Sequence, residues 1–230
     1  MQEIGNILSQ LDTQTLLFLN SFHTNFTDHI MWYVTTKWTW LPLYAAILYV
    51  IIKRGNKYAI MISIAAFVLT IICTDQICAS IIRPYIHRLR PSNAFNPISS
   101  MLHLVNGYRG GTYGMPSCHA ANSFGLAFFM MFYFRNRVLN FFMFSWAILN
   151  AYSRIYTGVH YPSDLLVGGL VGLGSAFLIY SILKWLDKKD YIPKDIVEYP
   201  WNTKSVSMII YLGGTNILAI IIYSLFMIFI

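Results

Sequence analysis

The sequence has 230 residues, of which 57% are hydrophobic and only 11% charged, whereas a soluble domain of this length carries charges on about a quarter of its residues. The formal net charge is +7, but the basic residues form no long tract and no basic face, which argues against a nucleic-acid partner. Apolar runs of about twenty residues recur, and each can cross a hydrocarbon core about 30 Å thick. These features exclude a soluble globular protein and indicate a polytopic membrane protein.

In chain order, residues 4–30 mix apolar and polar positions and predict a short amphipathic helix in the membrane interface, with a core-packed helix as the alternative. Residues 91–115 are polar and rich in Gly, Asn and Ser, which predicts a loop. The apolar segments predict about six transmembrane helices. They cover residues 40–52, 58–82, 116–134, 138–152, 162–185 and 206–230. We therefore expect an all-α polytopic membrane helix bundle with an N-terminal interfacial helix, forming a single domain over residues 1–230.

Basic residues between the predicted spans indicate the orientation. One side carries Lys53, Arg54, Lys57, Arg135, Arg137 and the lysine-rich connector 186–204. The positive-inside rule makes that side cytoplasmic. Several arginines on the opposite side would weaken this assignment unless they bind an anion.

Three polar clusters interrupt the apolar chain, all on the predicted outer side. In "RPYIHRLRP", Arg83 and Arg90 are seven positions apart, so on one helix both would point from the same face, about 10.5 Å apart. The second cluster is "PSCH" at residues 116–119, and the third is "SRIYTGVHYPSD" at residues 153–164.

Together these residue types predict a phosphate site. Guanidinium groups match phosphate oxygens in a bidentate way, and a helix beginning near Pro116 offers free backbone N–H groups to an anion, with Ser117 adding a hydroxyl. With two histidines, one can attack phosphorus while the other protonates the leaving oxygen. Asp164 would hold the attacking ring in the right tautomer, although it could also only cap the helix after Pro162.

The three clusters resemble the signature of the type 2 phosphatidic acid phosphatase family, which shares its site with vanadium haloperoxidases. That signature is K-x6-R-P, then P-S-G-H, then S-R-x5-H-x3-D, and this sequence matches it in order and spacing over residues 83–164. Two positions depart from it: Arg83 replaces the lysine and Cys118 replaces the glycine. Cys118 is not expected to act as a cysteine-phosphatase nucleophile, because Phe124 stands where such enzymes need an arginine.

The resemblance implies a role for each matching residue. His160 would be the nucleophile that forms a phosphohistidine, oriented by Asp164, and His119 would be the general acid that later activates water. The phosphoryl group would be held by Arg83, Arg90, Arg154, Ser117 and the backbone of Cys118. The family needs no metal, and we expect no metal and no cofactor here.

The loop "NGYRGGTYG" at residues 106–114 has two interpretations. It is either a mobile lid whose Arg109 reaches a second phosphate, or an ordinary flexible loop. The glycines of "GGLVGLG", residues 168–174, are expected to let helices approach closely.

From these observations we predict a lipid phosphatase of a bacterial inner membrane, with its active site facing the periplasm. Its partners would be the membrane bilayer and a phosphorylated lipid substrate. Arg109 favours a substrate with two phosphates, such as undecaprenyl pyrophosphate. The alternatives are lipid A phosphate, phosphatidylglycerol phosphate and phosphatidic acid. An alternative from another functional class is a membrane binding or transport protein that holds a phosphorylated lipid without hydrolysing it. A vanadate-dependent peroxidase is disfavoured because its relatives are soluble.

Overall fold

The computed structural model describes residues 2–193, 196–197 and 199–229, and within them the chain is helical, with no strand. The helices are α1 (Gln2–Asn20), α2 (Asn25–Thr35), α3 (Leu41–Ile52), α4 (Lys57–Gln76), α5 (Arg83–Ile86), α6 (Cys118–Phe134), α7 (Arg137–Tyr156), α8 (Pro162–Lys188) and α9 (Thr203–Phe226). A π-helical segment, Ile77–Ile82, joins α4 to α5.

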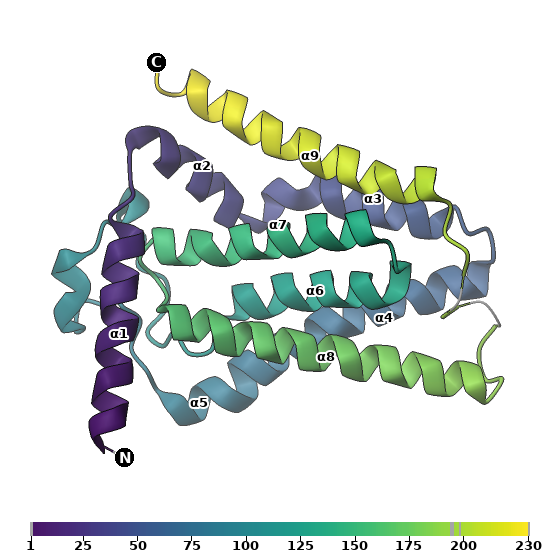
Figure 1. Ribbon diagram of the computed structural model, residues 1–230, viewed down its shortest axis with the longest axis horizontal. Coiled ribbons are helices and arrows are strands. Elements are labelled where there is room, and N and C mark those ends of the chain that lie inside the picture. Colours follow the sequence, from purple (N-terminus) through teal and green to yellow (C-terminus); the bar gives the residue numbers. More distant parts are fainter. Residues whose placement is uncertain (1, 194–195, 198, 230) are drawn as a thin grey trace.

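The long helices run side by side in a bundle, and α1 lies across the end at which α7 ends and α6 and α8 begin (Figure 1). Helix α6 is central and packs against α4, α7 and α8. Large apolar side chains cover the outside of the bundle, as expected for helices that face lipid tails. On α4 and α8 these exposed side chains include Val68, Leu69, Ile72, Leu166, Leu170 and Phe177. The fold class predicted from the sequence, an all-α membrane helix bundle, is therefore confirmed.

Among the described residues, three helical stretches are long and apolar enough to cross a membrane: Lys57–Ile86, Pro162–Lys188 and Thr203–Phe226. A shorter apolar stretch, Lys37–Ile52, contains α3. The prediction of six spans stays a prediction, because α6 and α7 are not among the helices that are both long and apolar enough to cross a membrane. The predicted end of the last span, Ile230, lies outside the described residues.

Glycines bring α6 and α8 into close contact. A Cβ added at Gly168 would lie 2.5 Å from the carbonyl oxygen of Ser117, and one at Gly172 would lie 2.6 Å from that of Ala121. The two backbones therefore touch, as predicted for this glycine-rich segment. This contact holds the start of α8 against the start of α6, where two of the three polar clusters lie.

Two local predictions were wrong. Residues 4–30 form parts of two helices, because the chain turns at residues 21–24 and Thr24 caps α2 by accepting a hydrogen bond from the N–H of Thr27 at 3.1 Å. Arg83 and Arg90 do not share a helix: α5 ends at Ile86, and His87 takes a left-handed conformation with φ of 49°. The turn redirects the chain, so Arg90 reaches the site from a loop.

Candidate active site

His160 lies at the centre of the site, in the loop between α7 and α8. Its Nδ1 is 3.1 Å from Asp164 Oδ2, and its Nε2 is 2.6 Å from Arg90 Nη1. His160 is 1% exposed and Asp164 is fully buried. Since a guanidinium has only donors, Nε2 must accept this hydrogen bond, and the ring proton lies on Nδ1, which donates to Asp164.

The surroundings keep the His160 ring neutral. Burial, followed by the positive charges of Arg90 and Arg154, lowers the pKa of His160 well below its usual value of 6.5. Burial and the charges of Arg154 and Arg83 also lower the pKa of Arg90, to about 10. Arg90 is thus still charged at neutral pH, and His160 presents an unprotonated nitrogen to an electrophile.

Asp164 makes both of the contacts considered from the sequence, one with His160 and one that caps α8. Its Oδ2 accepts from the backbone N–H of Tyr161 at 3.1 Å, which caps the start of α8, and the same oxygen accepts from His160. Its Oδ1 accepts from Arg88 Nη1 at 3.2 Å. Capping and orienting are therefore compatible, because both contacts use one fixed carboxylate.

The arginines of the three motifs are partly engaged with the protein. Arg83 Nη2 donates to the carbonyl of Pro116 at 2.8 Å and to Cys118 Sγ at 2.9 Å. Arg154 is buried and donates to Thr35 Oγ1 through a short hydrogen bond. In the described part of the chain, the buried Nε atoms of Arg83, Arg90 and Arg154 all have no hydrogen-bond partner. Three unsatisfied guanidinium donors in one cluster suit a multiply charged oxyanion.

The start of α6 completes the cluster. Ser117 is the N-cap, and its hydroxyl accepts from the N–H of Ala120 at 3.4 Å, while its own N–H donates to the carbonyl of Asp164 at 3.0 Å. Cys118 is the first helical residue and its φ is not positive. The cysteine therefore replaces the signature glycine without backbone strain.

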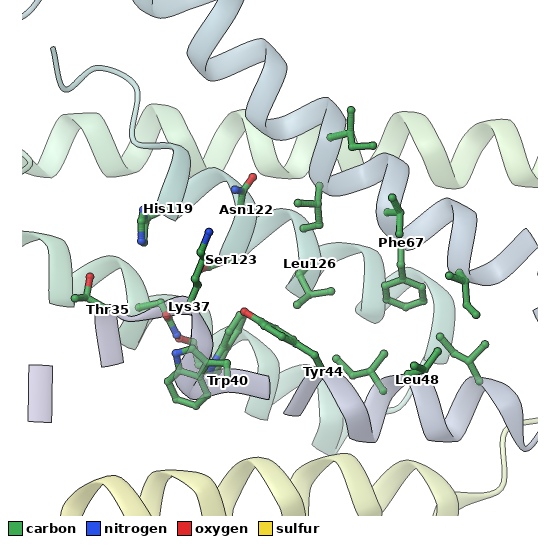
Figure 2. Close-up of a pocket in the computed structure, with 18 residues that line it drawn as sticks. Thr35, Lys37, Trp40, Tyr44, Leu48, Phe67, His119, Asn122, Ser123 and Leu126 are labelled. Atoms are coloured by element: carbon green, nitrogen blue, oxygen red, sulfur yellow. The ribbon is translucent and has the colours of Figure 1, made fainter. Parts of the chain in front are cut away.

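The exposed side chain of His119 faces a cavity of about 560 Å³ between α3, α4 and α6 (Figure 2). Polar residues gather at the end where His119 lies, and apolar residues such as Leu48 and Phe67 line the other end. The lining residues Tyr44 on α3 and Val68 on α4 are substantially exposed, so the cavity is open on its side between α3 and α4. An apolar cavity that ends at a polar cluster suits a ligand with a charged head and a hydrocarbon tail.

Arg109 does not join the cluster. Its Nη1 donates to the carbonyl of Ser92 at 2.6 Å and to Ser99 Oγ at 2.7 Å, and the hydroxyl of Ser92 in turn donates to the carbonyl of Arg109 at 2.6 Å. The side chain thus ties the two ends of one loop together. It lines a separate depression of about 330 Å³ rather than the cavity beside His119.

Several residues of the site were not identified from the motifs. Thr35, the last residue of α2, and Lys37, two positions later, line the cavity, and Asp12 and Arg88 lie next to Asp164. No spacing rule connects Asp12, Thr35 and Lys37 to the motifs, because these residues come from distant parts of the chain. Arg88 lies inside the first motif, at a position that the motif leaves unspecified.

Comparison with known proteins agrees with this geometry. A sequence model of the PAP2 superfamily matches residues 64–188, which contain all three motifs. The chain belongs to the PAP2 superfamily. Its relatives include a lipid A 4'-phosphatase from Bacteroides thetaiotaomicron, 43% identical over 95% of this chain and 97% of that protein. Another lipid A 4'-phosphatase, from Porphyromonas gingivalis, is 33% identical over 75% of this chain and 73% of that protein.

Two crystal structures share the fold. LpxE from Aquifex aeolicus superposes with a TM-score of 0.56 at 20% identity, over 74% of this chain and 95% of that one. A PAP2-type phosphatidylglycerolphosphate phosphatase from Bacillus subtilis superposes with a TM-score of 0.58 at 19% identity, over 79% of this chain and 88% of that one. The superfamily match and the two phosphatase relatives identify the chain as an integral membrane lipid phosphatase, as its sequence predicted.

Proposed function

We propose that this PAP2 phosphatase removes the 4'-phosphate from lipid A. The observation that carries the proposal is the position of His119, which belongs to the phosphate-binding motifs and also lines the end of a lateral apolar cavity. A lipid can therefore present its phosphate to the motif residues while its hydrocarbon stays in the bilayer. The two lipid A 4'-phosphatases among the relatives, which cover most of this chain, favour that lipid within the class.

In the proposed reaction, His160 Nε2 attacks phosphorus and the bond from phosphorus to the sugar oxygen breaks, while His119 gives its proton to that oxygen. Asp164 accepts the hydrogen bond from His160 Nδ1 and stabilises the positive ring. Water, deprotonated by His119, then attacks the phosphohistidine and releases inorganic phosphate. Arg83, Arg90 and Arg154 would stabilise the charge on the transferred group.

Binding of the lipid would use the cavity. One acyl chain would lie between α3 and α4, and Lys37 at the polar end would meet the acidic headgroup. The protein would act as one membrane-embedded domain in a bacterial inner membrane, with the motif end facing the periplasm. The basic residues at the opposite end of the bundle support this orientation.

The sequence-based preference for undecaprenyl pyrophosphate rests on Arg109 as a ligand of a second phosphate. Because Arg109 donates to Ser92 and Ser99, the geometry does not support that preference. Undecaprenyl pyrophosphate, phosphatidylglycerol phosphate and phosphatidic acid become alternative outcomes of the test.

The test is phosphate release by purified protein in detergent with EDTA, from each of these three lipids and from bisphosphorylated lipid A, beside His160→Ala. Mass spectrometry of the lipid product identifies which ester is cut. We expect metal-independent loss of the 4'-phosphate, absent in the variant. Release from another lipid in preference, or loss of the phosphate on the other sugar, would contradict the proposed substrate. Tight binding of lipid A without release would favour the binding or transport alternative.

A further inference from the structure

A chain of hydrogen bonds connects Asp164 to the N-terminal helix through one arginine. Arg88 Nη1 donates to Asp164 Oδ1 at 3.2 Å, and its Nη2 donates to Asp12 Oδ2 at 2.6 Å. Asp12 belongs to α1, and Arg88 belongs to the segment after α5. One guanidinium therefore bridges α1 to the carboxylate that orients His160.

The bridge is held from several sides. Arg88 Nη1 also donates to Ser163 Oγ at 2.6 Å, and the guanidinium lies 3.8 Å above the centre of the Tyr161 ring. Asp12 accepts from the N–H of Ser163 at 2.9 Å and from its hydroxyl at 2.5 Å. A side chain with this many partners keeps one rotamer, so it can define the position of its neighbours.

We propose that Arg88 and Asp12 are positioning residues for phosphoryl transfer. Asp12 holds the guanidinium of Arg88, and Arg88 holds Asp164 Oδ1, so that Asp164 Oδ2 points at His160 Nδ1. Helix α1, which lies outside the motifs, is then part of the catalytic arrangement. This inference rests on the proposed roles of His160 and Asp164.

The charges of Arg88 and Asp12 should have opposite effects on the protonation of the His160–Asp164 pair. The charged and titratable groups that face this pair are Arg83, Arg90, Arg154, His119, Arg88 and Asp12. The reaction needs neutral His160 and ionised Asp164. Losing the positive charge of Arg88 makes both states harder to keep as the pH falls, whereas losing the negative charge of Asp12 makes both easier. The two substitutions should therefore move the acid limb of the pH–rate profile in opposite directions.

The experiment measures kcat and KM against pH for bisphosphorylated lipid A in detergent. We expect Arg88→Gln to lower kcat about tenfold or more with little change in KM, since misplacement of a catalytic group lowers the rate of the chemical step. Its acid limb moves to higher pH, and Arg88→Lys restores part of kcat because it keeps the charge but not the planar fork. Asp12→Asn lowers kcat by less and moves the acid limb to lower pH.

Asp28→Asn is the matched control. Asp28 is also an ion-paired carboxylate from an N-terminal helix, 22% exposed against 10% for Asp12, and it pairs with His103 at 2.9 Å. We expect its kcat and acid limb to stay unchanged. Unmoved acid limbs in both test variants, or shifts in the same direction, would overturn the inference. If Arg88→Gln does not fold, the Asp12→Asn variant decides alone. An acid limb of Asp12→Asn at the native position would then overturn the inference. Retained activity in His160→Ala would instead refute the proposed chemistry.

Discussion

Arg90 Nη1 lies 2.6 Å from His160 Nε2, the nitrogen that we propose attacks phosphorus. The contact reveals the tautomer of the nucleophile, because a guanidinium can only donate. It also places a permanent positive charge where the phosphoryl oxygens would arrive. On substrate binding, Arg90 would turn from the ring nitrogen to a phosphate oxygen, which frees the nucleophile as the substrate becomes bound.

The lowered pKa of His160 predicts an acid-tolerant enzyme. Burial and the charge of Arg90 lower that pKa below 6.5, so the neutral ring persists as the pH falls through the usual value. The acid limb of kcat/KM should therefore lie below pH 6.5. A pH series of initial rates at low lipid concentration measures this limb. An acid limb at or above pH 6.5 would contradict this explanation.

Arg90→Gln should act on both charge and rate. Without the guanidinium, one cause of the lowered pKa of His160 disappears, so the acid limb moves to higher pH. The loss of a donor to the transferred phosphoryl group should reduce kcat by about 10² to 10³. The same pH series, run on this variant beside the native protein, tests both effects. A drop in rate with an unmoved limb would mean that Arg90 does not set the protonation of His160.

Filling the lateral cavity should impair lipid substrates selectively. Val68 and Leu69 are neighbours on α4 and are each 50% exposed, but only Val68 lines the cavity. We expect Val68→Trp to raise KM for lipid A several-fold and to leave hydrolysis of a soluble aryl phosphate unchanged, because the indole would occupy space that an acyl chain needs. Leu69→Trp is the matched control and should change neither. Equal effects of the two tryptophans would place the acyl chain elsewhere.

The contact between α6 and α8 predicts a difference between two glycines of one segment. A Cβ at Gly172 would lie 2.6 Å from the carbonyl oxygen of Ala121 and 2.7 Å from the N–H nitrogen of Gly125, whereas one at Gly174 would meet nothing within 4 Å. Gly172→Ala should destabilise the folded protein by about 1–3 kcal/mol, the usual cost of overpacking. Gly174→Ala should be neutral or slightly stabilising, since alanine favours helix. Thermal unfolding in one detergent compares them, and equal melting temperatures would contradict the close contact.

Restoring the signature glycine should be tolerated. Cys118 starts α6 with an ordinary φ, so Cys118→Gly removes the contacts of its thiol with Arg83 and Cys78 and costs about 0.5–1 kcal/mol of helix stability. We expect kcat of Cys118→Gly and Cys118→Ser to stay within about threefold of the native value, because a thiol is a weak hydrogen-bond partner. Phosphate-release assays compare them with His160→Ala. A loss as large as that of His160→Ala would assign chemistry to the thiol.

The sequence by itself determined the bundle and the core of the candidate site. Apolar segments long enough to span a bilayer can bury their backbone polar groups only as helices, so the fold class followed from composition and segment length. His160 and Asp164 are four positions apart across the start of α8, a separation at which local geometry alone brings the two side chains together. The likeness of the motifs then pointed to His119 and the arginines. The prediction that Arg83 and Arg90 share one helix was wrong, because nothing in the sequence signals the left-handed turn at His87.

Only the tertiary structure revealed which distant side chains support the site. Asp12 and Ser163 are 151 positions apart, and Thr35 and Arg154 are 119 positions apart, so no periodicity relates them. The engagement of Arg109 by its own loop and the lateral cavity beside His119 likewise depend on how helices and loops pack. A contact between distant segments is decided by the three-dimensional path of the chain, whereas a motif is decided by spacing along it. For that reason the residues that we propose do the chemistry were visible in the sequence, and the distant residues that contact them were not.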